Sequence, residues 1–201
     1  VFLKRQENHQ RRTWRHPIDG EPSFACEFRM LRYVEAHDVP APRPLFFGSA
    51  VADGKPRGIL MTQELAGYRP LDVVMRELFA DGAPPLVRKR LLLRKVAGLV
   101  RQMHDARVMH RSLYPKHLFV RWDDGAEPEV AVIDLEKSRT TLIAAVRTVY
   151  DLATLTRHSD YWSRSDRLYF LLHYLGLQRL TPWARRLCRW IVKRAQRKRR
   201  D

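Results

Sequence analysis

Cysteines and long apolar runs are both scarce in this sequence, and these absences exclude several classes of protein. Cys26 and Cys188 are its only cysteines, so there is no disulfide framework and no C-x-x-C motif, and a reducing compartment is the simplest interpretation. A membrane-spanning helix needs about 20 apolar residues, whereas the most apolar run, LYFLLHYLGL, is too short and contains His173. The start, VFLKRQENHQRR, is charged too early for a secretory signal peptide.

Acidic residues are scarce relative to basic ones. The chain has 22 Asp and Glu against 38 Lys and Arg, a net charge of +16. This excess favours a polyanionic partner, either a nucleic acid, an anionic membrane or a phosphorylated substrate, and charge alone does not choose among them. Apolar residues make up 45% of the 201 residues, enough to bury a core as one domain or two small lobes. The first residue is Val1 rather than Met, as in a fragment.

The expected elements divide the chain into a strand-rich part, residues 1–66, and a mainly helical part, residues 67–201. In the first part we expect strands that end at Lys4 and cover 45–48 and 58–65, with a helix over 23–37 capped by Ser23. In the second part we expect a strand over 130–134 and helices over 86–104, 142–157, 164–175 and 181–198. The pattern predicts an α+β fold of two lobes, and ligands often bind between such lobes.

The helix expected over 23–37 carries a carboxylate, Glu27, on the face that holds its apolar residues. A charged group on such a face is costly unless it is paired. Lys4, at the end of the first apolar run, is a candidate partner, and a Lys held in this way can reach nucleotide phosphates. Alternatively, Glu27 borders the core and pairs with a surface residue such as Arg32. The helix pattern does not decide between these interpretations.

Two further features suggest chemistry in the second part. The segment VMHRSLYPKHLFVRW, residues 108–122, is a polar loop between two apolar runs and begins with His110 and Arg111. Asp134 ends the run VAVID, and a carboxylate that leaves a buried strand is a good cation ligand because the sheet fixes its backbone. The alternative for Asp134 is a helix N-cap or a turn residue.

Taken together, a strand Lys, a helix Glu, a His-Arg loop and an Asp after a strand resemble the signature set of protein kinases. More narrowly, VFLKRQ, HRSLYPKHLFV and VIDLEKSR are similar to the Kdo/WaaP lipopolysaccharide kinase family, in particular its InaA-like branch. The resemblance extends from Val1 to about Gly176. It implies a protein-kinase-like fold with a small N-lobe, which lacks the first strands here, and a larger helical C-lobe.

The resemblance implies ATP and Mg²⁺ as cofactors and gives roles to the matching residues. Lys4 would hold the α and β phosphates, with Glu27 orienting it. The backbone of the hinge would meet the adenine, and the hinge residues would be Gln63, Glu64 and Leu65.

In the second part, the resemblance implies that Asp134 binds Mg²⁺ and that His117 stands in place of the metal-binding Asn of the kinase loop. Lys116 would reach the transferring phosphoryl group and offset its charge. Asp151, inside an apolar helix, would brace the backbone of the loop that begins at His110 and Arg111.

The sequence departs from the kinase pattern at three points. Ser112 occupies the position of the catalytic Asp, and a hydroxyl lacks the basicity to accept a proton near pH 7. His110 and His117 are the titratable residues of the loop and the candidates to substitute for it. No glycine-rich phosphate loop precedes Lys4, so either it was cut away with the N-terminus or the nucleotide is covered differently. Glu136 replaces the glycine of D-F-G, which predicts a stiffer loop.

The C-terminal segment TPWARRLCRWIVKRAQRKRR combines apolar residues at helical spacing with many basic ones. Two tryptophans on so basic a helix suit the interface of an anionic membrane. The favoured alternative is that Trp183, Leu187 and Ile191 pack on the helical lobe. We expect KRAQRKRR, residues 193–200, to be a free electrostatic tether.

The resemblance implies an ATP-dependent kinase that phosphorylates a sugar hydroxyl of the lipopolysaccharide inner core. It would act in the cytoplasm, peripherally at the inner face of the bacterial inner membrane, on lipopolysaccharide core or another acidic sugar-lipid. Ser112 motivates the alternative of a pseudokinase, a binding or regulatory module without turnover. A nucleic-acid-binding protein is a third hypothesis that rests on the net charge alone, because the sequence has neither aromatic residues interleaved on a sheet nor a recognition helix with polar readers.

Overall fold

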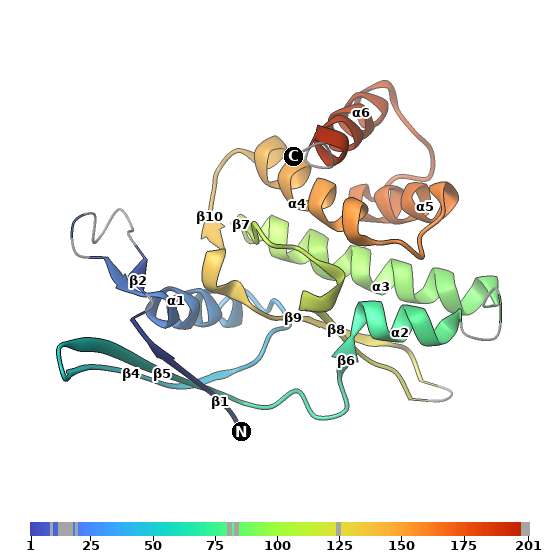
Figure 1. Ribbon diagram of the computed structural model, residues 1–201. Helices are drawn as coiled ribbons and strands as arrows, with labels where there is room; N and C mark the ends of the chain where they lie inside the picture. Colours follow the sequence, from blue (N-terminus) through green and yellow to red (C-terminus); the bar gives the residue numbers. More distant parts are fainter. Residues whose placement is uncertain are drawn as a thin grey trace.

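A computed structural model describes residues 1–8, 10–11, 18, 20–79, 82, 85–123 and 126–197. A three-stranded antiparallel sheet and one helix form one end of the molecule, and helices form the other end (Figure 1). The sheet has the order β1 (Phe2–Glu7), β5 (Lys55–Thr62), β4 (Pro44–Ala52). This arrangement agrees with the predicted α+β fold.

One face of this sheet is covered by α1 (Ser23–Glu35). Leu60 is fully buried, and its register partners in the neighbouring strands are Lys4 and Phe47. The Phe47 ring stacks on Phe28 of α1, with 5.9 Å between the ring centroids. Because side chains alternate between the two faces of a strand, these contacts place Lys4 on the same side of the sheet as α1.

The structure corrects four expectations for the first part. The first strand does not end at Lys4, because β1 continues to Glu7. The strands β4 and β5 meet in a tight hairpin at Asp53 and Gly54, both with positive φ, so each strand is longer than predicted at this end. β5 also ends at Thr62 rather than at residue 65. Ser23 does not cap α1: the residue before the helix is Pro22, and the Ser23 hydroxyl donates to Oε1 of Gln6.

The second part is built on α3 (Leu86–Asp105), α4 (Ala144–His158), α5 (Arg164–Leu175) and α6 (Pro182–Arg197), with the shorter α2 (Leu71–Leu78) beside them. α5 begins with a capping box formed by Ser163 and Asp166. Between α3 and α4 the chain forms short strands and 3₁₀ turns: β7 (Val108–Met109), η1 (Pro115–His117), β8 (Leu118–Arg121), β9 (Glu129–Val132), η2 (Leu135–Lys137) and β10 (Arg139–Thr140). β6 (Arg69–Pro70) pairs with β8, and β2 (Gln10–Arg11) pairs with β3 (Glu21–Pro22).

A single hydrophobic core connects the two parts, because buried residues of α1 and β5 belong to the same cluster as those of α3, α4 and α6. α1 also packs against η2, and the Val132 N–H donates to the Pro40 carbonyl over 2.9 Å. The predicted division into residues 1–66 and 67–201 therefore separates a strand-rich part from a mainly helical part, and the two parts share one hydrophobic core. Among the described residues, no helix is long and apolar enough to cross a membrane.

The C-terminal helix differs from its prediction in two respects. Leu187 and Ile191 are buried as expected, but Trp183 is 58% exposed. Residues 193–197, expected to be a free tether, are the last turn of α6, and residues 198–200 of the predicted tether lie outside the described part. The helix persists because Ala195 continues the buried stripe, at 8% exposed.

Candidate active site

The Lys4–Glu27 pair is present and joins the sheet to α1. Lys4 Nζ donates to Glu27 Oε1 over 2.7 Å; the Glu27 side chain is 3% exposed, and that of Lys4 29%. The second carboxylate oxygen of Glu27 is buried without a hydrogen-bond partner. Burial raises the pKa of Glu27 above its usual range; Lys4 opposes this shift, and Asp134 and Glu136 add to it. The turn η2, which follows Asp134, packs against α1, the helix that carries Glu27.

The loop after β7 is braced by a carboxylate of α4. Asp151 is fully buried and accepts hydrogen bonds from the backbone N–H groups of His110 (2.7 Å) and Arg111 (2.8 Å). Arg111 adopts a positive φ of 67°, a strained conformation for a residue with a side chain. The two hydrogen bonds stabilise this turn, which is the contact expected of Asp151.

The His110 ring is held by contacts within the chain at both of its nitrogens. Its ring is completely buried, with Nε2 3.0 Å from the Ile133 carbonyl and Nδ1 accepting from the Ser112 N–H over 3.3 Å. A carbonyl only accepts, so Nε2 carries the hydrogen and both ring nitrogens are occupied. Burial also lowers the pKa of His110. The structure therefore does not favour His110 as a substitute for the missing base.

His117, at the end of η1 and just before β8, faces Asp134, which follows β9. Nδ1 of His117 lies 2.8 Å from the Ser112 carbonyl, and Nε2 lies 3.2 Å from Oδ2 of Asp134. The carbonyl requires the hydrogen on Nδ1, so in a neutral ring Nε2 presents a lone pair to the carboxylate. Burial lowers the pKa of His117 and favours this neutral form. Two acceptors that face each other in this way suit a cation between them.

Asp134 owes its position to an unusual backbone conformation rather than to a helix cap. Its φ is 60° and its ψ is 56°, and its side chain makes no capping hydrogen bond to η2. The side chain is 38% exposed, so it is open to a ligand.

The other predicted residues lie around this centre. Ser112 is 7% exposed, and its backbone carbonyl accepts a hydrogen bond from His117 Nδ1. This contact does not depend on which side chain stands at position 112. Lys116 is exposed, with its ammonium 5.7 Å from the centre of the Tyr114 ring. Glu136 is tied to the first part, because its carbonyl accepts from Arg11 Nη1 over 2.6 Å.

The predicted hinge follows β5. The Gln63 N–H donates to the Arg43 carbonyl over 2.8 Å, and the Leu65 carbonyl accepts from the Tyr68 N–H over 3.1 Å. The Glu64 side chain lies 3.6 Å from the N-terminal amine. Gln63 thus already uses its backbone donor within the chain.

Comparison with known proteins identifies the family of this chain. The model of the lipopolysaccharide kinase (Kdo/WaaP) family matches residues 1–174. The chain belongs to this family. It is 24% identical over 169 residues to protein InaA of Escherichia coli K12, which covers 83% of this chain and 75% of InaA.

The chain is also similar to the lipopolysaccharide core heptose(I) kinase WaaP of Pseudomonas aeruginosa PAO1. The two are 27% identical over 184 residues, which covers 85% of this chain and 66% of WaaP. A solved structure of WaaP in complex with acyl carrier protein matches with a TM-score of 0.69 and 26% identity, over 86% of this chain and 75% of that one. The predicted family and the kinase-like fold are therefore confirmed.

One buried hydrogen-bond network of this Kdo/WaaP family member was not predicted from the sequence. His104 Nε2 lies 3.1 Å from Asp151 Oδ2, its Nδ1 lies 2.7 Å from the Tyr174 hydroxyl, and that hydroxyl lies 2.8 Å from Thr148 Oγ1. Burial raises the pKa of Tyr174 to about 12. The sequence places His104 only at the end of the helix expected over 86–104. Its partner Tyr174 is 70 positions further along the chain, and local sequence patterns do not indicate contacts over such a separation.

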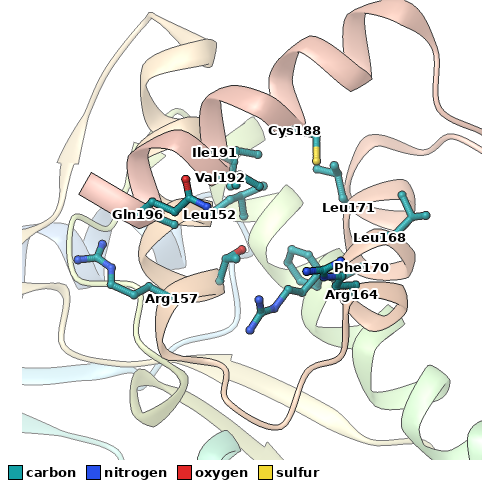
Figure 2. Close-up of a pocket in the computed structure, with 13 residues that line it drawn as sticks. Leu152, Arg157, Arg164, Leu168, Phe170, Leu171, Cys188, Ile191, Val192 and Gln196 are labelled. Atoms are coloured by element: carbon teal, nitrogen blue, oxygen red, sulfur yellow. The ribbon is translucent and has the colours of Figure 1, made fainter. Parts of the chain in front are cut away.

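A separate cavity of about 560 Å³ lies between α4, α5 and α6. Figure 2 shows its mostly apolar lining, which includes Leu152, Phe170 and Ile191, together with Arg157 and Arg164. No predicted site residue lines it. The cavity is therefore distinct from the centre formed by Lys4, Glu27, His117 and Asp134.

Proposed function

We propose that this chain is an ATP-dependent kinase that transfers the γ-phosphoryl group to a sugar hydroxyl of the lipopolysaccharide inner core. The observations that carry the proposal are the Lys4–Glu27 ion pair and the facing acceptors His117 and Asp134, on segments that pack against each other through α1 and η2. A positive group and a cation site beside each other suit a polyphosphate with its metal. Family membership and the similarity to a heptose kinase support the sugar acceptor.

Asp134 and His117 would hold a Mg²⁺ ion, which would offset the charge of the nucleotide phosphates. The fit rests on the lone pair of His117 Nε2 turned to the Asp134 carboxylate at 3.2 Å. The described residues contain no group of three or more His, Cys, Asp or Glu side chains placed to hold a metal. Two protein ligands are sufficient, because Mg²⁺ usually keeps waters and substrate phosphates as its other ligands.

Lys4 would bind the phosphates as the nucleotide's principal cationic contact, and Glu27 would hold its ammonium in position. For the adenine, the Gln63 donor is already used, so we assign the adenine contacts to the backbone of Glu64 and Leu65. ATP, when bound, supplies the phosphoryl group. Lys116 would offset the charge of that group during transfer.

Transfer would proceed without a strong base in the loop. Ser112 cannot accept the hydroxyl proton near pH 7, and both ring nitrogens of His110 are bonded within the chain. Phosphoryl transfer depends mainly on positioning and electrostatic stabilisation. The lack of a base in the loop therefore slows the reaction without abolishing it. We therefore expect a slow kinase.

The alternative, a pseudokinase that binds without turnover, also follows from Ser112, and one experiment separates the two. Lipopolysaccharide truncated to its inner core is incubated with γ-labelled ATP and Mg²⁺, using the wild-type chain and Ser112→Asp. We expect slow label transfer by the wild type and a gain of about 10²-fold or more in the variant, the usual contribution of a general base. Label transfer by neither protein, with nucleotide binding intact, favours the pseudokinase.

Such an acceptor places the enzyme at a lipid surface. We propose a cytoplasmic protein bound peripherally at the inner face of the bacterial inner membrane, where its positive field attracts both anionic lipids and acidic core sugars. The net charge also suits nucleic acid, but no observation in the site favours that partner.

A further inference from the structure

An uncovered apolar tip marks the start of α4. Leu142 is 78% exposed, Ile143 61% and Val146 42%. We call these three residues the apolar tip. Large aliphatic side chains grouped in this way are uncommon on the surface of a protein without a partner.

The apolar tip is not needed to hold its own loop. The Thr141 N–H donates to the Arg107 carbonyl over 2.9 Å, and the Thr141 carbonyl accepts from Arg147 Nη1 over 3.1 Å. The Val146 N–H then donates to the Ile143 carbonyl over 3.1 Å and begins the helix. Backbone and Arg contacts thus fix the loop, while the aliphatic side chains point into solvent.

The second feature is the outer face of α6. Its buried stripe consists of Ala184, Leu187, Ile191 and Ala195. The remaining surface carries a cationic face of five exposed residues: Arg185, Arg186, Arg189, Lys193 and Arg197. Trp190 is 46% exposed beside it, with the guanidinium of Arg186 5.7 Å from its ring centre.

The apolar tip adjoins the basic helix α6. α4 and α6 pack against each other (Figure 1), and the Arg194 guanidinium of α6 lies 4.1 Å from the centre of the Tyr150 ring of α4. Val146 precedes Tyr150 by four residues, so the two share a face of α4. The apolar tip therefore lies on the side of α4 that meets the basic C-terminal half of α6.

We propose that the apolar tip and the cationic face of α6 form a docking surface for an anionic lipid bilayer. Aliphatic side chains at a protruding loop insert below the headgroups, while Arg, Lys and an interfacial Trp stay at the level of the phosphates. Charge complementarity selects the occupant, because α6 contains several exposed Arg and Lys residues and no Asp or Glu. The choice of a lipid rather than a protein surface rests on the proposed function, in which the acceptor sugar is attached to a lipid.

This surface would also orient the enzyme. The loop of the apolar tip directly follows β10, which itself follows Asp134 and η2 along the chain. Only six residues lie between Asp134 and Thr141. Docking at the apolar tip would therefore hold the phosphoryl-transfer centre near the headgroup layer.

The test is co-sedimentation of the full chain with vesicles of phosphatidylcholine alone or with phosphatidylglycerol. The apolar variant is Leu142→Ser/Ile143→Ser, and its matched control is Leu86→Ser/Val87→Ser, another exposed aliphatic pair at a helix start. The charge variant is Arg189→Gln/Lys193→Gln, and its control is Arg76→Gln/Arg94→Gln, which removes the same net charge elsewhere.

We expect binding only to the vesicles that contain phosphatidylglycerol, and weaker binding in high salt. The apolar variant should bind about tenfold more weakly or worse, and the charge variant more than about tenfold more weakly, with both controls unchanged. Equal binding by the apolar variant and its control, or an absence of vesicle binding with binding to acyl carrier protein instead, overturns the proposal. Mg²⁺–ATP binding by the same proteins is measured in parallel, and its failure would count against the kinase and not against the docking surface.

Discussion

At the scale of single residues, the candidate site holds charged groups where burial opposes them. Glu27 is buried with one carboxylate oxygen lacking a hydrogen bond, and burial raises its pKa despite the ion pair with Lys4. A raised pKa in the folded state means that ionisation of Glu27 reduces stability. This cost fits a residue retained to orient Lys4 for a ligand and not to stabilise the fold.

Replacement of Glu27 by Gln should therefore have opposite effects on stability and on binding. The stabilising contribution of protonated Glu27 is present below its unfolded pKa and is lost as the pH rises through its raised folded pKa. The free energy of unfolding of Glu27→Gln relative to the wild type should thus increase from about pH 4 to pH 8 in urea denaturation, while Mg²⁺–ATP affinity falls about tenfold or more. A stability difference that is the same at every pH contradicts this account of Glu27.

Glu35→Gln provides the matched control, because Glu35 lies on the same helix but is exposed and pairs with Arg43 at the surface. Its effect on nucleotide affinity should be negligible.

At the scale of elements, the sequence predicted amphipathic helices better than strands and helix ends. α5 has the predicted bounds because its apolar spacing is regular and the capping box marks its start. The hairpin of β4 and β5 was too short in the prediction, because Gly48, Ser49 and Pro56 interrupt the apolar alternation. Ser23 was assigned as a cap by residue type, but Pro22 occupies that position and the Ser23 hydroxyl bonds to Gln6.

The capping box of α5 is a specific source of stability. Asp166 Oδ2 accepts from the Ser163 backbone N–H over 2.9 Å, and Asp166 Oδ1 lies 3.0 Å from Lys89 Nζ of α3. Asp166→Ala should lower the free energy of unfolding by about 2–4 kcal/mol, since it removes a cap and leaves a largely buried ammonium unpaired. Urea denaturation measures the loss, and Ser165→Ala, which removes only an exposed contact of 2.8 Å with the Ser163 hydroxyl, should cost less.

Burial raises the pKa of Asp166, but its contacts with Ser163 and Lys89 lower it by more, so the pKa in the folded state lies below its usual value. The stabilising contribution of ionised Asp166 is therefore present above the unfolded pKa. It should disappear as the pH falls through the folded pKa. A penalty for Asp166→Ala that persists undiminished in acid would contradict the charge-based part of the explanation.

At the scale of the whole molecule, the two parts meet at the proposed nucleotide site. The sequence motifs and the family resemblance identified Lys4, Glu27, His117, Asp134 and Asp151, and the structure brings together the pairs Lys4–Glu27, His117–Asp134 and Asp151 with the His110 loop. The sequence did not predict the exposure of Trp183 or the network of His104 with Tyr174, because both depend on which distant helix faces cover each other. The loop conformation that engages both ring nitrogens of His110 likewise appears only in the folded chain.

The central claim is that these pairs bind a nucleotide with its metal. The most direct test is a thermal-shift titration of the full chain with ATP, with and without Mg²⁺, beside Lys4→Ala and Asp134→Ala. Arg5→Ala serves as the control, since Arg5 lies on the opposite face of β1. A ligand that binds only the folded state stabilises it by about 2.7 kcal/mol at a hundred times its Kd.

We predict a stabilising shift that requires Mg²⁺, is lost in Lys4→Ala and Asp134→Ala, and is retained in Arg5→Ala. A shift that is independent of the metal, or that survives both site variants, would contradict the proposed nucleotide site.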